Sequence, residues 1–248
     1  MSEQNNAERD DSGFGWKLWA ALGLVAVIVA LGIILSVANL FDGGGEKKEG
    51  SGDSPSTSAA PSGEATKASD KSKCGLPGYA ASGTVTKAPA KTEWTIVGTT
   101  AAPKVGKAGP GKIDGDGYRQ CFAHTPEGAV VAAANYFALT SDYSLDKKLA
   151  TDGMAKGKGR DASMKSAGSH SSSGVRAQIE GFSVVSYSGT KASVDIAFRM
   201  SSGEQMSATY FLVWEDGDWK MQVNDDGGVL AQPQQITSLD GYVPWAGA

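Results

Sequence analysis

The sequence predicts an α+β domain in which helices come first and an antiparallel sheet follows. Apolar side chains over residues 126–138 recur at helical spacing, directly after the capping residue Thr125. From residue 175 onward apolar and polar residues alternate, the period of a strand with one buried face. A long apolar run near the N-terminus adds a membrane-spanning helix ahead of this domain.

The predicted main helix has a well-defined start. Thr125 is a good N-cap, Pro126 suits the first helical position, and Glu127 complements the helix dipole. The apolar residues from Val130 to Ala138 are spaced to share one face, and small alanines among them favour close packing against a sheet.

Shorter elements surround this helix. We expect a short strand near residues 94–97, a short helix capped by Ser141 or Asp142, and a loop or weak helix over 154–166. The C-terminal half then holds four predicted strands, joined by short Gly-containing turns that make consecutive strands antiparallel neighbours. They cover residues 175–187, 190–200, 206–215 and 218–224.

Residues 16–41 are predicted to cross a membrane. Positions 18–35 carry no charge, and roughly 20 apolar residues suffice for a hydrocarbon core about 30 Å thick. Trp16 and Trp19 lie at one boundary and Phe41 at the other, where aromatic rings anchor a helix at the interface. The alternative is a cleaved signal peptide, but the apolar run is long and the segment before it is acidic.

The rest of the chain is divided around this helix. Residues 1–15 form a short head, expected to be cytoplasmic, and residues 42–73 lack any hydrophobic side chain larger than Ala, which predicts a disordered tether. Residues 74–248 form the globular domain. Lys and Arg flank both ends of the helix almost equally, so the charge count alone does not orient it. The cysteines favour an extracytoplasmic position for the globular domain. With the one predicted span at 16–41, the chain is expected to be a single-pass protein of the cell membrane.

Cys74 and Cys121 are the two cysteines of the chain. An even number, both in the soluble part, suits an oxidising compartment and predicts a disulfide between them. Such a bond would join the start of the domain to the loop before the main helix. The alternative is two independent buried thiols.

The composition offers little material for catalysis or metal binding. A net charge of −4 gives no basic field for direct nucleic-acid contact, and two cysteines and two histidines lie too far apart in sequence for a zinc site. The run Gly106–Lys112 approaches a phosphate-binding loop but has Ile113 where a hydroxyl is needed. We therefore predict no catalytic residue, no metal, no cofactor and no enzymatic activity.

Charge is uneven within the domain. Residues 147–165 hold six Lys or Arg against two Asp, whereas residues 215–226 hold five acidic residues against one Lys. Opposed patches of this kind could steer a partner or self-association into a homo-oligomer. The alternative is two solvated faces.

The order of elements, and the hairpin Trp214–Met221 at the end of the sheet, resemble the NTF2-like (cystatin-like) fold over residues 124–224. That resemblance implies helices packed on a curved antiparallel sheet, often with a pocket between the main helix and the concave face. The residues expected to line it are Phe137, Val194, Asp195, Ile196 and Phe198.

A second resemblance narrows the expected role. CGLPG at 74–78, the Gly109–Pro110 turn, CFAHTPEGAVVAAANY at 121–136 and the ending 239–245 resemble actinobacterial membrane-anchored proteins associated with integrative and conjugative elements. With an NTF2-like domain, this implies an architecture similar to the VirB8 and TcpC class of conjugation components. The expected function is a non-enzymatic scaffold or accessory subunit of a type IV secretion-like complex, whose partners are the lipid bilayer and other conjugation or secretion subunits. The alternative is an extracytoplasmic ligand-binding module that uses the pocket.

Overall fold

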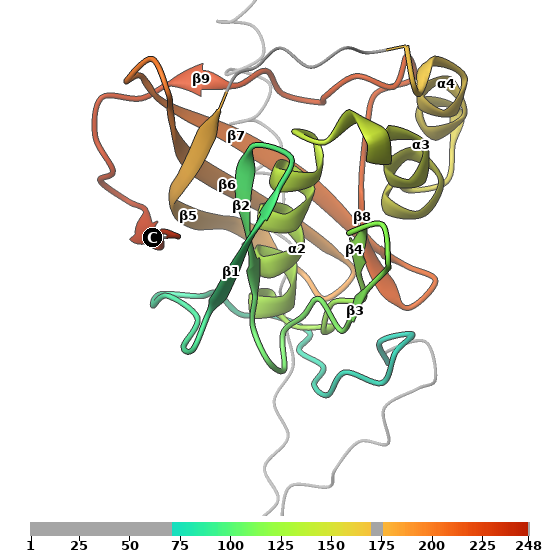
Figure 1. The fold of residues 1–248 in the computed structure, drawn as a ribbon. Coiled ribbons are helices and arrows are strands. Elements are labelled where there is room, and N and C mark those ends of the chain that lie inside the picture. Colours follow the sequence, from blue (N-terminus) through green and yellow to red (C-terminus); the bar gives the residue numbers. More distant parts are fainter. Residues whose placement is uncertain (1–70, 170–175, 248) are drawn as a thin grey trace, which may run out of the picture. The chain divides into compact units, whose positions relative to one another are not determined.

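Helix α2 (Pro126–Leu139) begins where the sequence predicts. The Thr125 hydroxyl accepts a hydrogen bond of 3.0 Å from the Gly128 amide, and Pro126 occupies the first turn, where no intrahelical donor is needed. The computed structural model describes residues 71–169 and 176–247. Within them, α2 lies at the centre of the domain, with β5, β6 and β7 passing behind it in Figure 1.

The main sheet is a meander whose strand pairs are antiparallel. β5 (Ala177–Tyr187), β6 (Lys191–Met200), β7 (Gln205–Glu215) and β8 (Asp218–Met221) follow one another in space as in sequence. This confirms the four predicted strands, with small differences at their ends. Two short strands complete the sheet: β9 (Gln234–Gln235) pairs with β7, and β10 (Val243–Pro244) pairs with β5.

Two hairpins precede α2. β1 (Glu93–Val97) and β2 (Thr100–Lys104) form one, and β3 (Lys112–Ile113) and β4 (Arg119–Gln120) form the other. The first hairpin packs on α2 through β2, on a different side of the helix from β6 (Figure 1). The Asn135 side chain donates 2.9 Å to the Pro103 carbonyl and so fixes the contact between β2 and the helix.

After α2 the chain forms a series of short turns. A 3-10 turn (Tyr143–Leu145), α3 (Asp146–Lys148), a π-helical turn (Leu149–Gly153) and α4 (Lys158–Ser166) follow in order. Asp142 caps the first of these, as predicted, by accepting from the Ser144 amide. Of the loop or weak helix expected over 154–166, the part from Lys158 to Ser166 is helical and forms α4.

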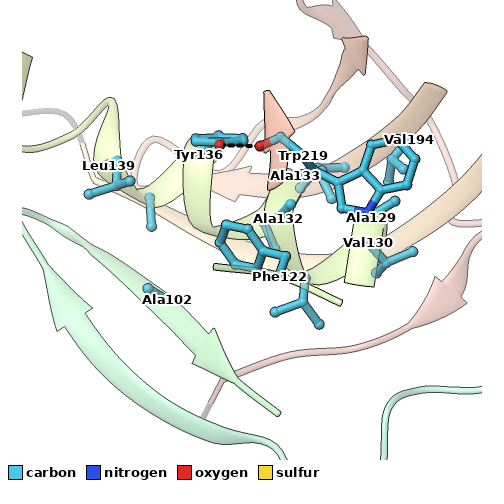
Figure 2. Close-up of a cluster of buried hydrophobic side chains, with 14 of the residues drawn as sticks. Ala102, Phe122, Ala129, Val130, Ala132, Ala133, Tyr136, Leu139, Val194 and Trp219 are labelled. Carbon is cyan, nitrogen blue, oxygen red and sulfur yellow. Dashed lines mark hydrogen bonds between the residues drawn. The ribbon is translucent and has the colours of Figure 1, made fainter. Parts of the chain in front are cut away.

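The expectation that α2 buries a single face is wrong. Every residue from Gly128 to Leu139 except Phe137 is buried, because the sheet covers one side of the helix and the β1–β2 hairpin covers another. The alanines permit these close approaches on both sides. Figure 2 shows the resulting core, in which the Tyr136 hydroxyl donates to the Trp219 carbonyl at 2.5 Å.

The described part of the molecule is therefore α+β, with a mostly antiparallel sheet and few helices, as predicted. Within residues 71–169 and 176–247 no helix is both long enough and apolar enough to cross a bilayer. The predicted span 16–41, with Trp16, Trp19 and Phe41, lies outside those ranges. The predicted tether extends to residue 73, but Ser72 is already buried and the Lys73 amide donates 2.8 Å to the Gly217 carbonyl.

Candidate binding cleft

Around Val194 and Ile196 the space between α2 and the sheet is filled by side chains. Val194 and Ile196, two of the residues expected to line a pocket there, have no exposed surface and pack in the core with Val130. Packing of this density leaves no room for a ligand at their positions. The sequence pattern identified these residues correctly as inward-facing, but it does not distinguish a packed interior from an open pocket.

Asp195 faces the opposite side of the sheet. Successive side chains of a strand alternate between faces, so Asp195 cannot point the same way as Val194 and Ile196. Its carboxylate accepts a hydrogen bond from Thr209 Oγ1 at 3.1 Å and one from the Tyr242 hydroxyl. The expectation that Asp195 lines the pocket is therefore wrong, and the residue instead ties the C-terminal segment to β6 and β7.

Phe137 and Phe198 do border open space. Their ring centroids lie 4.6 Å apart, and both rings line a cavity of about 240 Å³. This cavity adjoins a larger cleft of about 450 Å³, since both are lined by Tyr210, Met221 and Val223.

The cleft, defined here as the larger cavity with its smaller extension, lies beyond the C-terminal end of α2. Its walls come from four parts of the chain: the end of α2, the helical turns after it, strands β7 and β8, and the segment after β8. The larger cavity is lined by Thr140, Tyr143, Leu149, Ala150, Met154, Ser163, Ala167, Tyr210, Met221, Val223 and Val229, among others.

The walls of the cleft are mainly apolar, with a few hydroxyl groups and the carboxylates of Asp146 and Asp226. Ser163 Oγ donates 3.2 Å to the Gly227 carbonyl, which links α4 to the segment after β8. Burial raises the pKa of the Tyr210 hydroxyl above its ordinary value, so this group is neutral and able to donate at physiological pH. Val229 and Leu230 lie at the rim with about half of their surfaces exposed, at 47% and 48%.

Of the five residues expected to line a pocket, Phe137 and Phe198 line the smaller extension of this cleft, but the sequence pattern missed its larger part. Its far wall is the segment from residue 224 to 233, which follows the predicted strands and has no regular period. The available signal was the apolar pair Val229–Leu230 in an otherwise polar, Gly-rich stretch. In the structure this pair borders the cleft.

The disulfide predicted between Cys74 and Cys121 is present, with Cα atoms 6.1 Å apart. It joins the start of the domain to the loop that leads into α2. His124, three residues later, is buried and stacks on Trp214 at 3.8 Å between ring centroids, while its Nε2 bonds to the Gly189 carbonyl. His124 thus belongs to the packed core.

The two oppositely charged segments lie against each other. Lys156 contacts Asp216 at 2.7 Å, and Lys158 approaches Asp225 at 3.9 Å. The positive segment 147–165 is therefore partly neutralised by the negative segment 215–226 within one molecule. This arrangement removes the basis for expecting two separate patches that steer a partner.

The titratable groups of the described ranges contain no cluster of three or more His, Cys, Asp or Glu side chains that could hold a metal ion. Fold and cleft together define a disulfide-linked α+β domain with a packed interior and an apolar cleft on its surface.

Residues 53–244 match the family model described as Domain of unknown function (DUF8175), and the chain belongs to that family. Neither the curated proteins nor the solved structures contain a match to this chain.

Proposed function

We propose that this chain is a membrane-anchored, non-enzymatic accessory subunit of a conjugative, type IV secretion-like transfer complex. Its globular domain is NTF2-like and lies outside the cytoplasm, where it contacts other subunits. The observation that carries this proposal is the filled interior between α2 and the sheet, where Val194 and Ile196 are fully buried. A domain whose described interior is packed in this way is expected to act through its surface and its peripheral cleft.

Two features of the sequence support the same role. The apolar segment 16–41 has the length of a membrane span, and residues 42–70 resemble a spacer that lets the domain reach partners near the membrane. The motifs at 74–78 and 121–136 resemble those of proteins associated with conjugative elements.

The cleft is the surface through which contact with a channel subunit is expected. An apolar concavity with half-exposed Val229 and Leu230 at its rim suits an apolar side chain or short segment of another protein. The nearby ion pairs of Lys156 and Lys158 supply a polar rim of the usual kind.

The test is cross-linking of the tagged full-length chain in cells that carry the conjugative element, followed by mass spectrometry of co-purified proteins. We expect channel subunits to be recovered, and to be lost when residues 16–41 are replaced by a secreted leader. Leu230→Asp should reduce their recovery, whereas Val185→Asp, a similarly exposed apolar position on β5, should not. Recovery of no envelope subunit with the native chain would overturn the proposal.

A second candidate function is binding of a small apolar ligand, and the cleft volume of about 450 Å³ favours it. The probe is a fluorescent fatty acid added to the purified full-length chain. Ala167→Trp, which would fill the cleft, should abolish binding, while Ala162→Trp on the same part of the chain should not. Equal binding by both variants would exclude the cleft as the ligand site.

A further inference from the structure

Within residues 71–169 and 176–247, one edge of β1 has no partner strand, and the register of the β1–β2 hairpin identifies which edge it is. The strands join through a two-residue turn, with Val97 opposite Thr100. Residues that flank such a turn exchange both backbone hydrogen bonds, and bonded pairs then alternate with non-bonded pairs along the ladder. Thr95 is therefore bonded to β2, whereas Trp94 and Ile96 direct their N–H and C=O groups away from it.

The position of proline supports this register. Pro103 lies opposite Trp94 and has no N–H to donate, which is tolerated only at a non-bonded position of the ladder. The Pro103 carbonyl points outward on the other side of the hairpin, where it accepts the hydrogen bond from Asn135.

The outer edge of β1 is open to solvent. Among the strands of the described ranges, only β2 pairs with β1. Thr95 is exposed, and Ile96 is 68% exposed, a large apolar side chain on an edge strand. Proteins usually protect such an edge with a charge, a proline or a bulge, because unpaired backbone groups are a template for another strand. Here the charge lies only at the start of the strand, at Glu93.

We propose that β1 is a docking edge for a second copy of this chain, and that two β1 strands pair antiparallel about a twofold axis at Thr95. Most soluble homo-oligomers are symmetric, and a twofold axis makes each contact occur twice. With this axis, Trp94 lies opposite the partner copy's Ile96, and each pair exchanges two backbone hydrogen bonds.

The side chains fit this pairing better than pairing with an arbitrary strand. Trp94 and Ile96 lie on the same face of β1, where the half-buried Trp94 ring packs on Trp245 with centroids 5.0 Å apart. Each exposed Ile96 would gain the remaining open edge of that aromatic ring from the other copy. Aromatic and β-branched residues are favourable cross-strand pairs. Glu93 faces the partner copy's Val97, and no like charges are placed opposite each other within β1.

Pairing would convert two separate hairpins into one four-stranded sheet. A two-stranded hairpin is marginal by itself, and here β2 packs on α2 and β5 while Trp94 of β1 packs on Trp245, which leaves the outer edge of β1 as the part that a second copy would cover. The strand is short, so the contact is smaller than a typical stable interface and we expect a weak dimer in dilute solution. Confinement of both copies to one membrane, as the segment 16–41 implies, would raise their effective concentration.

The decisive test is Thr95→Cys in the full-length chain. On the twofold axis the two residues at position 95 would form a non-bonded pair with Cα atoms about 4.5 Å apart, within the range of a disulfide. The two native cysteines are already bonded to each other and do not compete. Membranes that contain the variant are treated with a mild oxidant, and the dimer fraction is read on a non-reducing gel.

We expect Thr95→Cys to give a covalent dimer at least tenfold faster than Val185→Cys, an exposed control position on β5. Adding Ile96→Asp to Thr95→Cys should reduce that rate to the control level, because a carboxylate would then oppose the partner copy's Trp94. The rate of dimer formation is also measured with chain purified in detergent and oxidised at several concentrations. Strand pairing predicts a rate that levels off as the concentration rises, whereas chance collision predicts a rate that keeps rising. Equal rates for positions 95 and 185, or a dimer unaffected by Ile96→Asp, would overturn the proposal.

Discussion

At the scale of single residues, Asp218 joins the sheet to the loop before α2. Its side chain is fully buried, and its two oxygens accept the amides of Cys121 at 2.9 Å and Phe122 at 2.8 Å. Lys73 lies 3.1 Å away and Lys220 3.8 Å. Cys121 adopts a left-handed backbone conformation, φ 76°, which turns the two successive amides toward the same carboxylate.

We predict that Asp218→Ala strongly destabilises the domain. The change leaves two buried amides without an acceptor and Lys220 without its counter-charge, and breaking a buried charge network costs about 3–5 kcal/mol. The measurement is denaturant unfolding under non-reducing conditions. Asp216→Asn removes an exposed ion pair on the same hairpin and serves as the control, with a much smaller expected loss. Equal effects of the two substitutions would contradict this role for Asp218.

Gly128 occupies a position in α2 with no space for a side chain. A Cβ atom there would lie 2.0 Å from the Ala123 carbonyl oxygen, which belongs to the backbone and cannot rotate away. We predict that Gly128→Ala lowers the free energy of unfolding by about 1–3 kcal/mol or more. Gly106→Ala, where nothing lies within 4 Å, should have little effect. Thermal melting of both variants is the measurement, and a neutral Gly128→Ala would show that α2 can shift.

At the scale of elements, the β3–β4 hairpin is held to α3 by charge. Lys148 contacts Asp114 at 2.5 Å and Asp116 at 2.9 Å, and its ammonium lies 5.3 Å from the centre of the Tyr118 ring. Hydrogen bonds from Lys148 and then Lys112 hold the pKa of Asp114 below its ordinary value near 3.8. Lys148 has the same effect on the pKa of Asp116.

These lowered pKa values predict how stability depends on pH. A carboxyl group with a lowered pKa in the folded state stabilises the fold above its ordinary pKa, and this contribution is lost as pH falls through the lowered value. Lys148→Gln should therefore lower the melting temperature at about pH 7, and its difference from the native chain should shrink below about pH 4. Melting curves across this range test the prediction. A difference that stays constant with pH would show that Lys148 acts through packing alone.

At the scale of the whole molecule, the disulfide closes a loop of 47 residues that contains both hairpins preceding α2. A loop of this length is associated with about 4 kcal/mol of stabilisation, through restriction of the unfolded chain. We predict a loss near this size when Cys74 and Cys121 are both replaced by Ser, measured by denaturant unfolding. Reduction of the native chain should give the same loss and provides an independent control. A loss under about 1 kcal/mol would mean that the unfolded chain is already restricted in this region.

Local signals in the sequence were sufficient for most of the elements. The cap at Thr125, the alternation along β6 and the short turns between strands determine structure through neighbouring residues, so they could be recognised without a fold. The burial of α2 on two sides could not be recognised from the sequence, because the second covering layer is a hairpin whose own sequence is short and irregular. The same limit applies to the cleft, whose walls come from segments far apart in the chain.

Local spacing and residue type were enough to predict the class of fold, the order of the four central strands and the disulfide between the two cysteines. The folded arrangement was needed to show that Val194 and Ile196 fill the interior and that Asp195 binds Tyr242 on the other face of the sheet. It was also needed to place the apolar cleft beyond the end of α2. Those outcomes depend on which side chains meet across the sheet and on how much volume they occupy. Neither quantity is contained in the period of a sequence pattern.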